Sequence, residues 1–130
     1  MYPQDYERAQ VNLDASEDFH GLTSLQDNLA FDVLETGMSI FPNMLLVNEP
    51  MLISDGANSD IRYNFFYPRW AYDEYRNLLA ERAGQNHWNY LDTWDLVPMQ
   101  EFTNSGVHMT PYGESLLTEK VAEKIQTICK

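Results

Sequence analysis

Two short strand-like runs, each followed by a polar loop and a helix-like segment, constrain the fold of this chain most strongly. Residues 44–47 read Met-Leu-Leu-Val, and residues 88–92 read Trp-Asn-Tyr-Leu-Asp. The first is continuously apolar, which is typical of a strand buried on both faces of a parallel sheet. Because helical patterns alternate with these strands, we predict an α/β fold with parallel pairing and right-handed crossovers.

Three segments have the apolar spacing of amphipathic helices. The first is predicted to begin at about residue 22, and Gly37 and Pro42 bound its end. The second stops at Gly84, a residue type common at helix ends. Before the third, Thr110 is a suitable N-cap and Pro111 suits the first helical position. This last helix is expected to bury Leu117, Val121, Ile125 and Ile128.

Two strands are fewer than a stable sheet usually contains. We therefore predict that residues 22–130 form the C-terminal portion of a three-layer, flavodoxin-like α/β domain with a parallel sheet. Residues 1–21 are polar and acidic and are expected to form a lead-in segment. The missing strands would come from an N-terminal half that these residues do not encode.

The charge balance limits the expected partners. The sequence has 8 Lys and Arg against 20 Asp and Glu, which gives a net charge of −12. Such a surface repels phosphates, so neither nucleic acid nor an anionic membrane surface is an expected partner. No stretch reaches the roughly 18–20 apolar residues of a membrane span, and the first residues lack a signal-peptide pattern. Cys129 is the only cysteine and cannot form an internal disulfide, so the compartment stays open.

The loop that follows the second predicted strand carries the most informative residue, His108. Residues 102–113 read Phe-Thr-Asn-Ser-Gly-Val-His-Met-Thr-Pro-Tyr-Gly, so His108 directly precedes a capped helix. Reactive groups of parallel sheets collect in the loops at the carboxyl ends of the strands. A histidine there is well placed to act as a general base for a hydroxyl nucleophile.

This segment resembles the last conserved block of the SGNH/GDSL hydrolases, in which an Asp precedes a His, a Met-Thr or Leu-Thr pair, a Gly and the final helix. Weaker likenesses occur at residues 46–50, 70–72 and 90–92, so the resemblance extends over about residues 22–130. It implies an ester hydrolase, or acylhydrolase, in which His108 is the catalytic base.

Two departures from the family pattern matter. The family Asp is replaced by Asn104 at a four-residue spacing from His108, or by Ser105 at a three-residue spacing. Asn104 is either an orienting partner of His108 or an Asx-turn residue. The serine nucleophile block is absent, and Ser54 follows the wrong strand to replace it. We therefore expect no ester hydrolase activity from this chain alone.

The resemblance implies a small-molecule ester or acylated substrate. Asn48 and Glu49, just past the first strand, and the aromatic residues Tyr67 and Trp70 are the candidate substrate-binding residues. Aromatic clusters are also common in cores, so the aromatic segment around residues 63–72 is either a pocket or a core.

No cofactor or metal is predicted. Asp55, Asn58 and Asp60 favour a polar turn over a calcium site, because their spacing is not that of an EF-hand. Three other roles stay open: a non-catalytic binding or assembly module, an O-acyltransferase resembling the teichoic-acid D-alanylation proteins, and a fragment without independent function. Self-association, or pairing with a missing N-terminal half, is expected because an incomplete sheet exposes a strand edge.

Overall fold

The computed structural model describes residues 22, 24–55, 58–103 and 105–129, so the predicted lead-in segment 1–21 lies outside the described residues. The described part is a small mixed α/β structure with three α-helices and a two-stranded parallel sheet. In chain order the elements are the 3-10 turn η1 (Gln26–Asn28), α3 (Phe31–Ile40), β1 (Leu45–Asn48), α4 (Arg69–Gln85), β2 (Asn89–Asp92), the 3-10 turn η2 (Met99–Glu101) and α5 (Pro111–Ile128).

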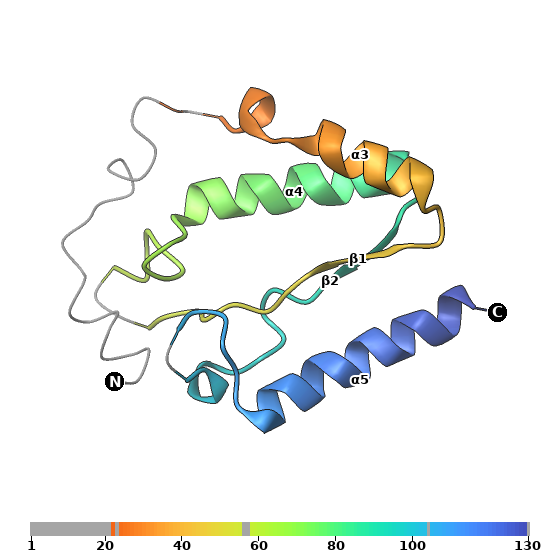
Figure 1. Cartoon of the computed structure of the whole chain (residues 1–130). Helices are drawn as coiled ribbons and strands as arrows, with labels where there is room; N and C mark the ends of the chain where they lie inside the picture. The colour runs from red at the N-terminus through yellow and green to blue at the C-terminus, as the bar shows by residue number, and fades with distance from the viewer. Residues whose placement is uncertain (1–21, 23, 56–57, 104, 130) are drawn as a thin grey trace.

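The two strands pair in parallel, as predicted. Their register sets Leu45 opposite Asn89 and Asn48 opposite Asp92. Helices α3 and α4 lie on one side of the strands and α5 lies on the other (Figure 1). The prediction of an α/β arrangement with parallel pairing is therefore confirmed at this level.

The first helix begins later than the predicted start near residue 22, and it ends between Gly37 and Pro42 as predicted. The chain instead forms the turn η1, and α3 begins only at Phe31 and continues through Gly37 to Ile40. The reason is a tertiary contact with α4: the carboxylate of Glu74 accepts hydrogen bonds from Ser24 Oγ at 2.7 Å and from the Leu25 amide at 3.0 Å. These bonds hold the chain that precedes α3 against α4.

The second helix ends at Gln85, one residue after the stop predicted at Gly84. The left-handed residue after α4 is His87, with φ of 56°. Its amide donates to the Gly84 carbonyl at 3.3 Å, and the Trp88 amide donates to the Ala83 carbonyl at 2.9 Å. This pair of bonds is a Schellman motif, in which glycine is the usual residue at the His87 position.

The last helix begins as predicted, because Thr110 Oγ1 accepts a hydrogen bond from the Gly113 amide at 3.2 Å and Pro111 follows the cap. The predicted burial of its apolar face is wrong. Ile125 is 46% exposed, and the other three residues of the predicted stripe are only half-buried. A two-stranded sheet is too narrow to cover an 18-residue helix.

Part of the core lies between α3 and α4, where Phe31, Met38 and Leu79 are buried, and part lies in the loops beyond the carboxyl ends of the strands. One cluster contains the buried residues Met51, Tyr63 and Tyr72, and a second contains Leu52, Val97 and Phe102. Both clusters are anchored by the segment that directly follows β1. Two buried clusters therefore lie at the edge of the sheet where a parallel α/β protein usually binds its ligand.

Candidate functional site

Asn64 organises the loop between β1 and α4. It is 1% exposed, and its Nδ2 donates to the Leu52 carbonyl at 2.9 Å. Its Oδ1 accepts from the amides of Phe66 at 2.9 Å and Tyr67 at 3.2 Å. An asparagine that supplies both donors and acceptors in this way fixes the aromatic segment before α4 against the segment after β1.

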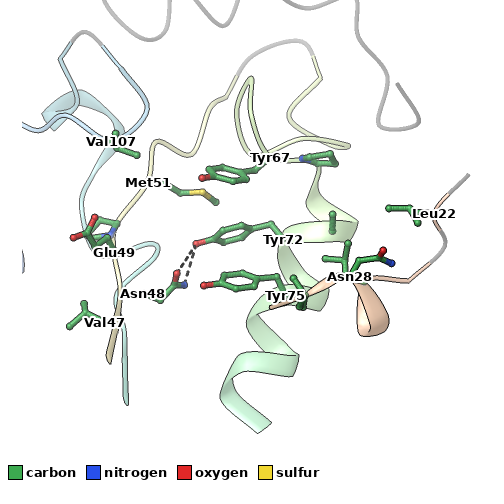
Figure 2. A pocket seen from close by; sticks show the side chains of 15 residues that line it. Leu22, Asn28, Val47, Asn48, Glu49, Met51, Tyr67, Tyr72, Tyr75 and Val107 are labelled. Atoms are coloured by element: carbon green, nitrogen blue, oxygen red, sulfur yellow. Dashed lines mark hydrogen bonds between the residues drawn. The ribbon is translucent and has the colours of Figure 1, made fainter. Parts of the chain in front are cut away.

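A cavity of about 510 Å³ lies between η1, the end of β1 and the start of α4 (Figure 2). This volume is within the range of small-molecule sites. Among the residues that line it, the polar and charged ones are Asn28, Asn48, Glu49, Tyr67, Tyr72 and Tyr75. Several apolar residues complete the wall, including Leu22, Leu25, Leu29, Pro68, Ala71 and Val107.

Three tyrosine rings form one wall of the cavity. The ring centroids of Tyr67 and Tyr72 are 5.1 Å apart, and those of Tyr72 and Tyr75 are 5.8 Å apart. Their hydroxyl groups point the same way, toward β1 (Figure 2). Burial raises the pKa of Tyr72 to about 12 and also raises the pKa of Tyr75 above its ordinary value. Both phenols therefore stay protonated at neutral pH.

A polar network joins this wall to both strands. Asn48, which is buried, donates its Nδ2 to the Tyr72 hydroxyl at 3.2 Å and to Asp92 Oδ1 at 2.9 Å. Asp92 Oδ2 also accepts from Arg76 at 2.8 Å. The Arg76 guanidinium lies 4.1 Å from the centre of the Trp94 ring. The parallel register makes this possible because it sets Asn48 beside Asp92.

The two sequence neighbours of Asn48, Val47 on β1 and Glu49 directly after it, point to the other side from Asn48 (Figure 2). This follows from the alternation of side chains along a strand. Glu49 is exposed and lines the cavity at its rim, with its carboxyl group turned away from the tyrosine hydroxyls. The side of the cavity formed by the three tyrosines is therefore uncharged.

The loop that carries His108 is held in a closed turn. Phe102 and Met109 form an antiparallel bridge, and the Thr103 amide donates to the His108 carbonyl at 2.9 Å. Ser105 Oγ accepts from the amides of Val107 at 3.2 Å and His108 at 3.0 Å. His108 is an exposed residue in this turn, directly ahead of α5.

A backbone hydrogen bond links the turn that carries His108 to the loop after β1. The Leu52 amide donates to the Gly106 carbonyl at 2.8 Å. Val107 lines the cavity, whereas His108 is not among the lining residues. His108, the general base predicted from the sequence, therefore directly follows a residue of the cavity wall. Asn104, its predicted orienting partner, lies outside the described residues.

Of the four predicted substrate-binding residues, the structure brings together Asn48, Glu49 and Tyr67 around the cavity. Trp70 lies in the first turn of α4, half-buried, and does not line it. Sequence reasoning missed Tyr75 as a wall residue. Its spacing of three residues from Tyr72 sets both rings on one face of α4, and that spacing was readable from the sequence.

The described residues contain no group of three or more His, Cys, Asp or Glu side chains that could hold a metal ion. Within the same part of the chain, no helix is long and apolar enough to cross a membrane. No protein-family model, curated protein or solved structure matches this chain. The case for a function therefore depends on the geometry of the cavity and of the His108 loop.

Proposed function

We propose that this chain is the C-terminal portion of an SGNH-type ester hydrolase or acyl transferase in which His108 is the general base. The observation that carries the proposal is the junction of the two loops. The loop bearing His108 is bonded to the loop after β1 through Leu52 and Gly106, and Val107 lines the cavity at that junction. A base and a ligand-sized cavity therefore share the carboxyl edge of a parallel sheet, where such sites are expected.

We further propose that additional strands complete a three-layer, flavodoxin-like sheet. The central residues of both strands, Leu46, Val47, Tyr90 and Leu91, are only half-buried. Apolar residues of a central parallel strand are normally buried on both faces. Helix α5 also leaves Ile125 exposed. The partial burial of both strands and of α5 supports the proposal that further strands extend the sheet.

In the proposed reaction, the His108 imidazole takes the proton of a serine hydroxyl as the serine oxygen attacks the ester carbonyl. The imidazolium then gives that proton to the departing alcohol. Water, or an acceptor hydroxyl in a transferase, repeats the two proton transfers to release the acyl group. The serine and the oxyanion donors come from outside the described residues, and Asn104 is the proposed orienting partner of the imidazole.

The rival proposal is a binding module that retains the fold without catalysis. One observation favours it: among the described residues that line the cavity, none is a serine, threonine or cysteine. On this alternative the cavity holds a ligand and His108 has no catalytic role.

Labelling with a fluorophosphonate probe, which reacts with activated serines, separates the two proposals. The hydrolase proposal predicts that a longer protein containing this chain is labelled, whereas the chain of 130 residues alone is not. Absence of labelling in both would favour the binding module. Labelling of the 130-residue chain alone would show that the nucleophile lies within it, which contradicts the proposal as stated.

A further inference from the structure

The walls of the cavity differ in their chemistry. Glu49 is the only charged residue among the described lining residues, and its side chain points to the opposite face of β1 from Asn48 (Figure 2). The polar groups on the tyrosine side of the cavity are the phenol hydroxyls, the Asn48 amide and the Met51 thioether. Most of the remaining lining is leucine, proline, alanine and valine.

Most polar groups of the cavity lie on the side of β1, and Asn28 is the polar lining residue that lies near Leu22 at the other end (Figure 2). The hydroxyls of Tyr67, Tyr72 and Tyr75 point toward β1, whereas Leu22 lies on the opposite side of the three rings (Figure 2). Phenol hydroxyls donate and accept hydrogen bonds without carrying charge. A ligand that complements this arrangement has an uncharged oxygen at one end and a hydrocarbon body at the other.

We infer that this cavity binds the acyl part of the substrate, and that the acyl group is an uncharged chain of medium length. Its carbonyl end lies at the row of tyrosine hydroxyls beside β1, and its hydrocarbon extends toward Leu22. The location of the acyl end beside the His108 loop rests on the proposed function. An acetyl group is too small to fill a cavity of about 510 Å³.

Charged acyl groups fit this cavity poorly for two reasons. A carboxylate or an ammonium loses its hydration in an apolar cavity and finds no opposite charge on the tyrosine wall. An anion is also repelled by the net charge of −12. The same wall therefore disfavours an aminoacyl group and a free fatty acid.

Binding by this chain, without turnover, tests the inference. Four probes are titrated and followed by calorimetry and by the methyl NMR signals of Met51 and Val107: octanamide, acetamide, octanoate and octylammonium. Octanamide is expected to bind at least about tenfold more tightly than each of the others, since it alone combines a neutral carbonyl with a hydrocarbon chain. Equal or tighter binding of acetamide, octanoate or octylammonium would overturn the inference, as would no binding of octanamide.

Matched variants locate the site. Ala71→Leu adds bulk to a buried residue that lines the cavity, and Ala80→Leu makes the same change on an exposed position of α4. We expect Ala71→Leu to weaken octanamide binding about tenfold or more and Ala80→Leu to leave it unchanged. If Ala71→Leu does not fold, Tyr67→Ala is the second test, because Tyr67 is 38% exposed and its ring forms part of the wall. Unchanged binding in the folded variant would overturn the inference.

The outcome is separable from that of the proposed function. Serine labelling in the longer protein without octanamide binding would overturn the acyl site alone. Octanamide binding to this chain without labelling of the longer protein would overturn the hydrolase proposal and retain an acyl-binding cavity.

Discussion

Asn48 at the end of β1 donates a hydrogen bond to the Tyr72 hydroxyl on α4 at 3.2 Å. The same Nδ2 lies 2.9 Å from Asp92 Oδ1 at the end of β2. One buried amide thus connects both strands to the helix that forms the cavity wall. The arrangement explains how a sheet of only two short strands positions the start of α4.

Replacement of Asn48 by alanine is expected to lower the free energy of unfolding by about 1–3 kcal/mol, because the buried Tyr72 hydroxyl loses its hydrogen bond to the Asn48 side chain and Asp92 loses a donor. Asn77→Ala, on an exposed position of α4, is the control and should change the free energy of unfolding by no more than about 0.5 kcal/mol. Urea denaturation measures both values. Equal effects of the two substitutions would show that the network does not stabilise the fold.

Stability is expected to fall in alkaline solution. An unfolded tyrosine has a pKa near 10.0, and burial raises the pKa of Tyr72 to about 12 in the folded chain. The folded state therefore keeps the Tyr72 proton to a higher pH than the unfolded state does. The contribution of this phenol to the free energy of unfolding is complete below pH 10 and is lost between pH 10 and 12. The loss amounts to at most about 1.4 kcal/mol per pH unit for this group.

Tyr72→Phe should reduce the slope of unfolding free energy against pH between pH 10 and 11.5, whereas Tyr112→Phe, on an exposed position of α5, should not. Part of the slope should remain because burial also raises the pKa of Tyr63, Tyr75 and Tyr90. A stability that increases with pH in this range would contradict the assignment.

Two glycines in helices are expected to respond in opposite ways to alanine. A Cβ at Gly113 would lie 3.0 Å from Met109 Cβ and 3.1 Å from Val97 Cγ1, whereas a Cβ at Gly84 would meet nothing within 4 Å. Gly113→Ala should therefore destabilise the protein by about 1–3 kcal/mol through overpacking. Gly84→Ala should stabilise it by about 0.5–1 kcal/mol through its higher helix propensity. Thermal or urea unfolding measures both changes in the free energy of unfolding. Changes of the same sign in the two variants would contradict the prediction.

His87 adopts the left-handed conformation that closes α4, with φ of 56°. Glycine adopts this conformation without the steric cost that a Cβ brings. His87→Gly is therefore expected to raise the free energy of unfolding by about 1 kcal/mol. His87→Ala keeps the Cβ and serves as the comparison; if it stabilised the protein as much as glycine does, the backbone explanation would be wrong.

The elements that follow from local sequence were predictable, and those that depend on distant contacts were not. The parallel strands and the Thr110–Pro111 start of α5 follow from apolar runs and capping chemistry. The start of α3 was missed because Glu74, 50 residues away from Ser24, holds the preceding turn. The end of α4 was misplaced because the left-handed residue is a histidine rather than the nearby glycine.

The candidate site was predictable only in part for a similar reason. Asn48 was identified from its place at the end of a strand, but its burial depends on the register that sets it beside Asp92. The uncharged character of the tyrosine wall depends on Glu49 pointing to the other face of β1 (Figure 2). The register is not readable from residue types alone, whereas the direction of Glu49 follows from side-chain alternation once the strand is placed.

The most direct test of the central claim is the rate of fluorophosphonate labelling in the longer protein that the proposal requires, measured for three forms. His108→Ala should slow labelling by about 100-fold or more, because the serine loses its general base. His87→Asn, which removes another imidazole and suits the left-handed backbone, should label at the unmodified rate. Labelling of His108→Ala at the unmodified rate would contradict the account.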